Sequence, residues 1–190
     1  MNYEAILTFW FGNQGANNYG KPQKFWFIKD PEFDLQIKNS FESVYLQAKA
    51  AELDHWAKDA LGCLALIIVL DQFPRNMYRG QPQAFATDSQ ALALARYAVS
   101  KEYDRLLSPV QRWFIYLPYE HSESLEDQDI SVQLFSALKN DPHSQSSIDY
   151  AQRHRQIIQD FGRFPHRNQI LGRASTPEEI EFLSQPGSGF

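Results

Sequence analysis

The sequence has little cysteine and no long apolar run. Its single cysteine, Cys63, excludes an internal disulfide framework and a zinc site built from several cysteines. The longest apolar run, Ala60 to Leu70, has 11 residues, whereas a membrane-spanning helix needs about 20. The first residues, Met1 to Glu4, carry an acid and no base, unlike a secretory signal. We therefore expect a cytoplasmic protein that does not interact with a membrane.

The usual signals of nucleotide and nucleic-acid binding are also missing. The 190 residues include 18 basic and 23 acidic ones, which gives a net charge of −5 and argues against a general nucleic-acid partner. The sequence contains neither the dinucleotide-binding glycine pattern nor a phosphate-binding P-loop. The glycine-flanked serine of hydrolase nucleophile elbows is missing as well. We expect no nucleic-acid partner and no cofactor.

The composition is that of one globular domain. Hydrophobic residues make up 43% and charged residues 22%, which excludes the disordered and low-complexity classes. No linker divides the chain, so we expect a single domain over residues 1–190. The Gly- and Asn-rich stretch 12–22 is predicted to be a loop, and residues 186–190 a non-helical tail.

Apolar residues recur at helical spacing along most of the chain, whereas the alternation typical of strands is missing. The run Ala60 to Leu70 is apolar all round, which predicts a central helix buried on every side. Other helices are predicted over 33–48, 89–100, from 109, over 130–138, over 146–161 and from 177. The fold class is therefore all-α.

Capping residues mark several helix ends. Asp88 and Ser108 are predicted N-caps, and Thr176 is predicted to begin a capping box. Pro118 is predicted to end the helix that begins after Ser108. The side chains predicted to be nearly inaccessible are Leu64, Ile67, Ile68, Trp113, Phe114, Leu117, Phe161 and Phe164.

The first charged motif spans residues 70–80. Asp71 and Arg75 have the spacing of a helical ion pair. Pro74 leaves the carbonyl of residue 70 without its helical donor, so neighbouring polar side chains are expected to bond the freed carbonyls. Alternatively, the motif forms the polar wall of a pocket in which an arginine holds an anion. Its ligand-binding candidates are Asp71, Arg75, Asn76 and Arg79.

The second motif, residues 117–123, places His121 beside two carboxylates. Glu120 and Glu123 share a helix face if the helix continues past them. A histidine with neighbouring carboxylates suits an acid–base pair or a metal site. The structural alternative is an acidic helix start, since residues 119–129 carry five acids and no base.

The third motif, residues 160–173, is basic and follows a helix on which His154 is predicted to face inward. An inward histidine is usually a satisfied core residue, which is the alternative to a ligand role. Residues 151–173 carry five arginines, and these are expected to pair with the acids of 119–129. The ligand-binding candidates of this region are His154, Arg163, Arg167 and Asn168. The catalytic candidates of both regions are His121, His166, Glu120 and Glu123.

The three motifs together resemble a known family. The strings Leu-Asp-Gln-Phe-Pro-Arg-Asn at 70–76, Leu-Pro-Tyr-Glu-His-Ser-Glu at 117–123 and Phe-Gly-Arg-Phe-Pro-His-Arg-Asn at 161–168 are similar to those of the bacterial family catalogued as domain of unknown function 924. The resemblance covers essentially the whole chain. It implies an all-helical domain of about eight to ten helices, similar to tetratricopeptide-like helix arrays, and no settled activity.

Three functions compete on this basis. The first is a small-molecule pocket that holds an anion and supports acid–base or hydrolytic chemistry. The second is a helical interaction module that binds a peptide or protein in a groove while the charged motifs are structural. The third is a metal site of His121, His154, His166 and a glutamate, although we assign no metal ligand. For the first, we expect Asp71, Glu120, Glu123, Arg75, Arg163 and Arg167 to meet in space, with His121 or His166 among them.

Overall fold

The computed structural model describes residues 2–16 and 19–189, and within them every regular element is helical. The α-helices are α1 (Tyr3–Phe11), α2 (Pro31–Lys49), α3 (Ala60–Met77), α4 (Asp88–Ser100), α5 (Pro109–Glu120), α6 (Leu125–Ser136), α7 (Gln145–Phe161) and α8 (Pro177–Leu183). Single 3₁₀ turns lie between them: η1 (Lys24–Trp26), η2 (Asp54–Lys58), η3 (Pro82–Phe85), η4 (Tyr103–Leu106) and η5 (Pro165–Arg167). The predicted all-α class and single domain are confirmed.

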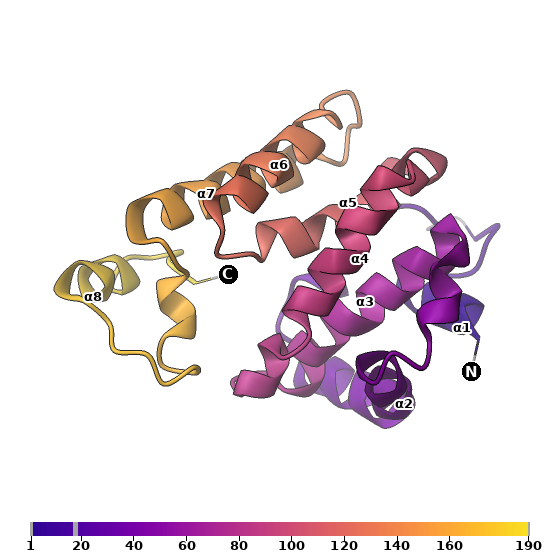
Figure 1. Cartoon of the computed structure of the whole chain (residues 1–190), viewed down its shortest axis with the longest axis horizontal. Helices are drawn as coiled ribbons and strands as arrows, with labels where there is room; N and C mark the ends of the chain where they lie inside the picture. The colour runs from indigo at the N-terminus through magenta and orange to yellow at the C-terminus, as the bar shows by residue number, and fades with distance from the viewer. Residues whose placement is uncertain (1, 17–18, 190) are drawn as a thin grey trace.

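Helix α3 is the centre of the domain. It packs against α1, α2, α4 and α5, and α6 and α7 pair with each other beyond α5 (Figure 1). Its side chains Leu64, Ile67 and Ile68 have no exposed surface, as predicted from the apolar run. Helix α8 lies at the end of the molecule away from α1 and α2, and the chain after it turns back toward the middle (Figure 1). The tetratricopeptide-like arrangement stays a prediction.

Helix α3 has the length and apolar character that a membrane span requires, but 89% of that 18-residue stretch is buried inside the domain. It is longer than the apolar run suggested, because it continues through Pro74 to Met77. Packing of the helix on all sides accounts for its composition without a membrane. The apolar run is therefore the core helix of this fold.

Two helices run through prolines that were expected to disturb or end them. Helix α5 continues past Pro118 to Glu120, so the prediction that Pro118 ends it was wrong. In α3, Pro74 cannot donate to the carbonyl of Leu70, and Thr87 Oγ1 donates to that oxygen instead, at 2.6 Å. The continued helices carry two of the charged motifs into the middle of the molecule.

The start of α4 differs by one residue from the prediction. Thr87 is the N-cap and Asp88 is the first helical residue, so the prediction of Asp88 as N-cap was wrong. The Asp88 carboxylate binds the Arg75 guanidinium rather than a backbone amide, with oxygen–nitrogen distances of 3.0 and 3.1 Å. The capping boxes at Ser108 and Thr176 are confirmed.

One predicted core residue is only half-buried. Phe161 ends α7, where Gly162 takes a left-handed φ of 68° and lets the chain leave the helix. There Phe161 packs on Phe182 of α8, with ring centroids 5.0 Å apart, in a small cluster separate from the main core. The prediction for Phe161 was therefore wrong, and the other seven predicted core residues are buried.

The aromatic N-terminal segments pack on the same core and fix η1 beside α5. Trp26 Nε1 donates to the Trp10 carbonyl at 3.0 Å, and the Trp26 ring contacts Phe114 of α5 edge-on, with centroids 4.9 Å apart. The described parts of 12–22 and 186–190 contain no helix, and residues 17, 18 and 190 lie outside the described chain. The arrangement leaves η1 next to the end of α5.

Candidate functional site

A pocket of about 590 Å³ lies where α3, α5, α7, η1 and η5 come together. All three charged motifs contribute to its wall. The polar side chains that line it are Gln72, Arg75, Asn76, Arg79, Glu120, His121, Ser146, Ser147, His154, His166 and Arg167. Residues far apart in the sequence therefore share one cavity, and of the six charged residues expected to meet, Arg75, Glu120 and Arg167 line it.

His121 and Asp71 form a buried dyad at one side of this pocket. His121 Nδ1 lies 2.8 Å from Asp71 Oδ1, and Gln72 also donates to the Asp71 carboxylate, at 2.6 Å. Burial would raise the pKa of Asp71, but Arg75 and His121 lower it well below its usual range. Burial, with Arg75, lowers the pKa of His121. A neutral His121 must then donate from Nδ1 to the carboxylate, which leaves Nε2 as a free base.

Two arginines share one carboxylate behind the pocket wall. Arg75 binds Asp88 through both terminal nitrogens, and its Nη1 also lies 3.3 Å from Asp71 and donates to the Asp71 carbonyl. The predicted ion pair of Asp71 and Arg75 is confirmed. Arg167 approaches the same Asp88 carboxylate from η5, with Nη1 and Oδ2 3.6 Å apart. Both oxygens of Asp88 therefore accept hydrogen bonds from Arg75, and Arg167 makes only the longer contact with Asp88.

Arg167 is the least satisfied charge of the site. Its side chain is 8% exposed, and its guanidinium lies between the rings of Phe85 and Phe164, 4.8 and 4.6 Å from their centroids. Its Nε has no hydrogen-bond partner in the part of the chain that the structure describes. Burial and the nearby Arg75 lower the pKa of Arg167 to about 10. A buried cation of this kind favours an anion from outside the chain.

Glu120 is a buried carboxyl group beside the dyad. Burial, together with the Asp71 charge, raises the pKa of Glu120 to about 8, so the group is mostly protonated at pH 7. Its Oε1 lies 3.2 Å from His154 Nδ1, while its buried Oε2 has no partner among the described residues. Glu120 therefore presents a neutral acid to the pocket.

Two further histidines line the pocket in the neutral form. His154 donates from Nδ1 to the Tyr150 carbonyl at 2.9 Å, and burial lowers its pKa to about 3. Its inward position was predicted. Burial and the Arg167 charge lower the pKa of His166 to about 4. In the described chain, no three His, Cys, Asp or Glu side chains are grouped as a metal site, so the third hypothesis, a histidine–glutamate metal site, has no such group behind it.

Arg79 and Asn76 line the pocket but are already paired. Both bind Asp34 of α2, Arg79 through two nitrogens at 2.7 and 2.8 Å and Asn76 at 2.8 Å. Burial opposes ionisation of Asp34, but the bonds from Arg79 and Asn76 lower its pKa overall. These two candidates close the pocket on the α2 side.

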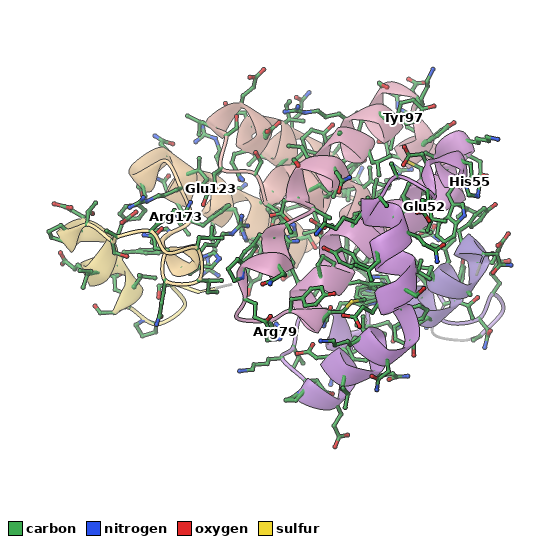
Figure 2. The ribbon with its side chains drawn as sticks, turned by 60° about the horizontal axis from the view of Figure 1, so that its bottom comes forward. Glu52, His55, Arg79, Tyr97, Glu123 and Arg173 are labelled. Atoms are coloured by element: carbon green, nitrogen blue, oxygen red, sulfur yellow. The ribbon has the colours of Figure 1, made fainter. Side chains whose placement is uncertain are left out.

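Four predicted site residues do not line the pocket: Asp71, which lies behind His121, and Glu123, Arg163 and Asn168. Glu123 binds Arg173 through both oxygens, at 2.7 and 2.9 Å, and accepts from the Phe164 amide (Figure 2). It lies past the end of α5, so it does not share a helix face with Glu120, and in Figure 2 the Glu123–Arg173 pair is well apart from Arg79. The prediction that Glu123 joins the pocket was wrong for this reason.

Arg163 and Asn168 belong to a third network. Arg163 forms two bonds with Glu179, at 2.6 and 2.8 Å, and Asn168 donates to the same carboxylate at 3.1 Å. The capping box at the start of α8 fixes the position of Glu179. Because Arg163 and Asn168 bind this carboxylate, they lie outside the pocket. The prediction that Arg163 meets the dyad was wrong for this reason.

Comparison with known proteins relates almost the whole chain to one family. The family model described as a bacterial protein of unknown function (DUF924) matches residues 6–187. The chain belongs to this family. The solved structure of ATU0120, a protein of unknown function from Agrobacterium tumefaciens, is similar to it, with a TM-score of 0.85 and 36% identity over 96% of both chains. The curated proteins give no match.

Several residues that line the pocket of this family member were not predicted from the sequence. Trp26, Phe27 and Ile28 form an apolar lip, and Leu117 and Tyr150 add apolar surface. The tripeptide Phe-Trp-Phe at 25–27 was visible, but nothing local places it beside α5. The role of Asp88 and the two rings around Arg167 depend on contacts between α3, α4 and η5, which no spacing rule reveals.

The predicted pairing of acids 119–129 with arginines 151–173 is found in part. Arg155 binds Asp129 at 2.6 Å and Arg173 binds Glu123, which ties α7 and the segment after η5 to α6 and its start. Asp127 instead binds Arg96 of α4 at 2.5 Å. Glu126 and Asp127 also occupy the first turn of α6, as the acidic helix start required. Many charged side chains of these motifs therefore form structural ion pairs, whereas Arg75, Glu120 and Arg167 line the pocket.

Proposed function

We propose that this protein binds a small organic anion in the pocket and carries out acid–base chemistry on it. The observation that carries the proposal is Arg167, a cation that is more than nine-tenths buried, faces the pocket and has an unpartnered Nε. Structural arginines of this chain, such as Arg163, are bonded to carboxylates in two-point contacts. A charge left without such a contact costs stability, which is common where a ligand supplies the missing partner.

The proton chemistry follows from the protonation states around the pocket. Neutral His121 has Nε2 as its free base, with Asp71 fixing the ring and its tautomer through Nδ1. Protonated Glu120 is an acid that lines the same cavity. A base and an acid on one pocket can remove a proton from a ligand or a bound water and return one to the product. Hydrolysis is one reaction of this class.

Binding is tested by titrating the protein with small anions at pH 7, monitored by nuclear magnetic resonance. The probes are acetate, benzoate, sulfate and inorganic phosphate. We expect at least one to shift signals of pocket residues, and Arg167→Met to weaken that binding at least tenfold. Arg155→Met is the matched control, because it removes the same charge from a pair outside the pocket. If no probe binds, or both variants lose binding equally, the pocket is not an anion site.

The chemical step is tested with a panel of small anionic esters, by measuring acid release. We expect His121→Gln to abolish turnover while anion affinity stays within about twofold of wild type. Loss of binding in this variant would instead give His121 a purely structural role. The alternative function, a helical interaction module with a peptide groove, predicts that no small anion competes with a bound peptide.

A further inference from the structure

We propose that the ligand is an amphipathic monocarboxylate, with its carboxylate on Arg167 and an aromatic or aliphatic body against the lip formed by Trp26, Phe27 and Ile28. This inference rests on the proposed function and adds the substrate class. Three independent observations support it: the charge balance around the pocket, the unpartnered Nε of the buried Arg167 guanidinium, and the apolar lip of the same pocket.

The charge balance argues against a ligand with two negative charges. The three pocket arginines, Arg75, Arg79 and Arg167, are matched by the three carboxylates of Asp34, Asp71 and Asp88 directly behind them. The pocket histidines are neutral by their environments, so they add no positive charge. A dianion would bring two uncompensated charges into this balanced cluster, whereas a carboxylate brings one. Phosphate monoesters are therefore the poorer ligands.

The geometry of Arg167 suits a carboxylate. The rings of Phe85 and Phe164 pack against its guanidinium, whose N–H donors all point outward along the edge of the plane. Its Nη1 is directed to Asp88 at 3.6 Å, and its unpartnered Nε lies on another part of that edge. A planar carboxylate accepts hydrogen bonds along such an edge, which gives both energy and orientation.

The apolar lip favours a ligand that has an apolar body as well as a negative charge. Phe27 and Ile28 are 62% and 57% exposed, although both line the pocket, and they follow the buried Trp26. The Phe27 ring is held in place by an edge-on contact with Trp26 at 6.3 Å and a parallel contact with Phe114 at 6.4 Å. Large apolar side chains exposed at the mouth of a polar pocket are typical of a surface that a ligand covers. A pocket of about 590 Å³ has room for a body of this kind beside the carboxylate.

The experiment compares five probes by calorimetric titration at pH 7. They are 3-phenylpropionate, its alcohol 3-phenylpropanol, acetate, phenyl phosphate and inorganic phosphate. We expect 3-phenylpropionate to bind at least tenfold more tightly than acetate and phenyl phosphate, and the neutral alcohol not to bind. Phe27→Ala should weaken 3-phenylpropionate at least fivefold and change acetate less than twofold. Leu106→Ala, which removes a 75% exposed apolar side chain on η4, is the matched control and should change neither.

The outcomes separate this inference from the proposed function. If acetate or a phosphate binds as tightly as 3-phenylpropionate, or if Phe27→Ala changes nothing, the substrate class is wrong while anion binding stands. If the alcohol binds as well as the acid, the carboxylate contact with Arg167 is wrong. If none of the four anions binds, the proposed function fails along with this inference.

Discussion

The Thr87 hydroxyl donates a 2.6 Å hydrogen bond to the Leu70 carbonyl, which Pro74 leaves without its helical partner. Both residues are buried, so removing the Thr87 hydroxyl leaves the Leu70 carbonyl without a hydrogen-bond donor from water or protein. We expect Thr87→Val to lower the free energy of unfolding by about 1–3 kcal/mol, measured by chemical denaturation. Thr87→Ser keeps the hydroxyl and should recover most of the loss.

A second background tests whether the proline is the cause. Pro74→Ala restores an amide that can donate to Leu70, so Thr87→Val should cost less in that background than in the wild type. An equal cost in both backgrounds would show that Thr87 stabilises the protein in another way.

The central position of α3 predicts a large effect of cavity formation. Ile68 has no exposed surface, and its replacement by alanine should cost about 2–5 kcal/mol of unfolding free energy. Ile180→Ala on α8 is the matched control, because that side chain is 59% exposed and should cost less than about 0.5 kcal/mol. Similar effects of the two changes in denaturant titrations would contradict a core built on α3.

Two arginines of the third motif, Arg163 and Arg167, should respond in opposite ways to substitution. Arg163 holds the buried Glu179 by two bonds, so Arg163→Ala should lower the melting temperature without changing affinity for a pocket anion. Arg167 is packed between two rings, and Arg75 alone still pairs Asp88. Arg167→Met should therefore be neutral or stabilising, by up to about 1–4 kcal/mol, while anion affinity is lost.

Calorimetry of both variants, with and without benzoate, measures the contrast. Strong destabilisation by both substitutions, with no response to the anion in the wild type, would indicate that both arginines are structural.

Glu120 makes the stability of the protein fall as the pH rises from about 4.5 to about 8. Burial, with the Asp71 charge, raises its pKa from 4.5 to about 8, so between these values the folded chain holds a proton that the unfolded chain has lost. The stabilisation is complete below about pH 4.5 and is lost as the pH rises through 8. Relative to Glu120→Gln, wild type should lose about 1.4 kcal/mol per pH unit between pH 6.5 and 7.5. Parallel curves from pH 6 to 9 would contradict a protonated Glu120.

The histidines act in the opposite direction at acid pH. His154 and His166 have their pKa values lowered by burial to about 3 and 4, so the unfolded chain binds protons first as the pH falls below 6.5. Their contribution to stability is present above that value and is lost at lower pH. The His154→Gln variant should show a shallower loss of melting temperature between pH 6.5 and 4.5 than the wild type. An unchanged slope would mean that His154 is not buried in the neutral form.

Much of the site could be predicted from the sequence, but not which charges meet. The spacing of Asp71 and Arg75 defines their ion pair within one helix, and the inward face of α7 places His154. Glu123 and Arg163 have the same chemistry as Glu120 and Arg167, yet they bind Arg173 and Glu179 instead. Any arginine can pair with any carboxylate, so the choice depends on where η5 and α8 dock.

The sequence by itself determined the all-α fold, the central helix and most helix starts. Those features follow from periodicity and from capping groups a few residues apart, which act locally. Only the tertiary structure decided that α3 and α5 continue through Pro74 and Pro118. In α3, Thr87 from the start of α4 supplies the bond that Pro74 removes. The tertiary structure also left Arg167 against two rings with a buried, unpartnered Nε, since Asp88 is bound through both oxygens by Arg75 from another helix.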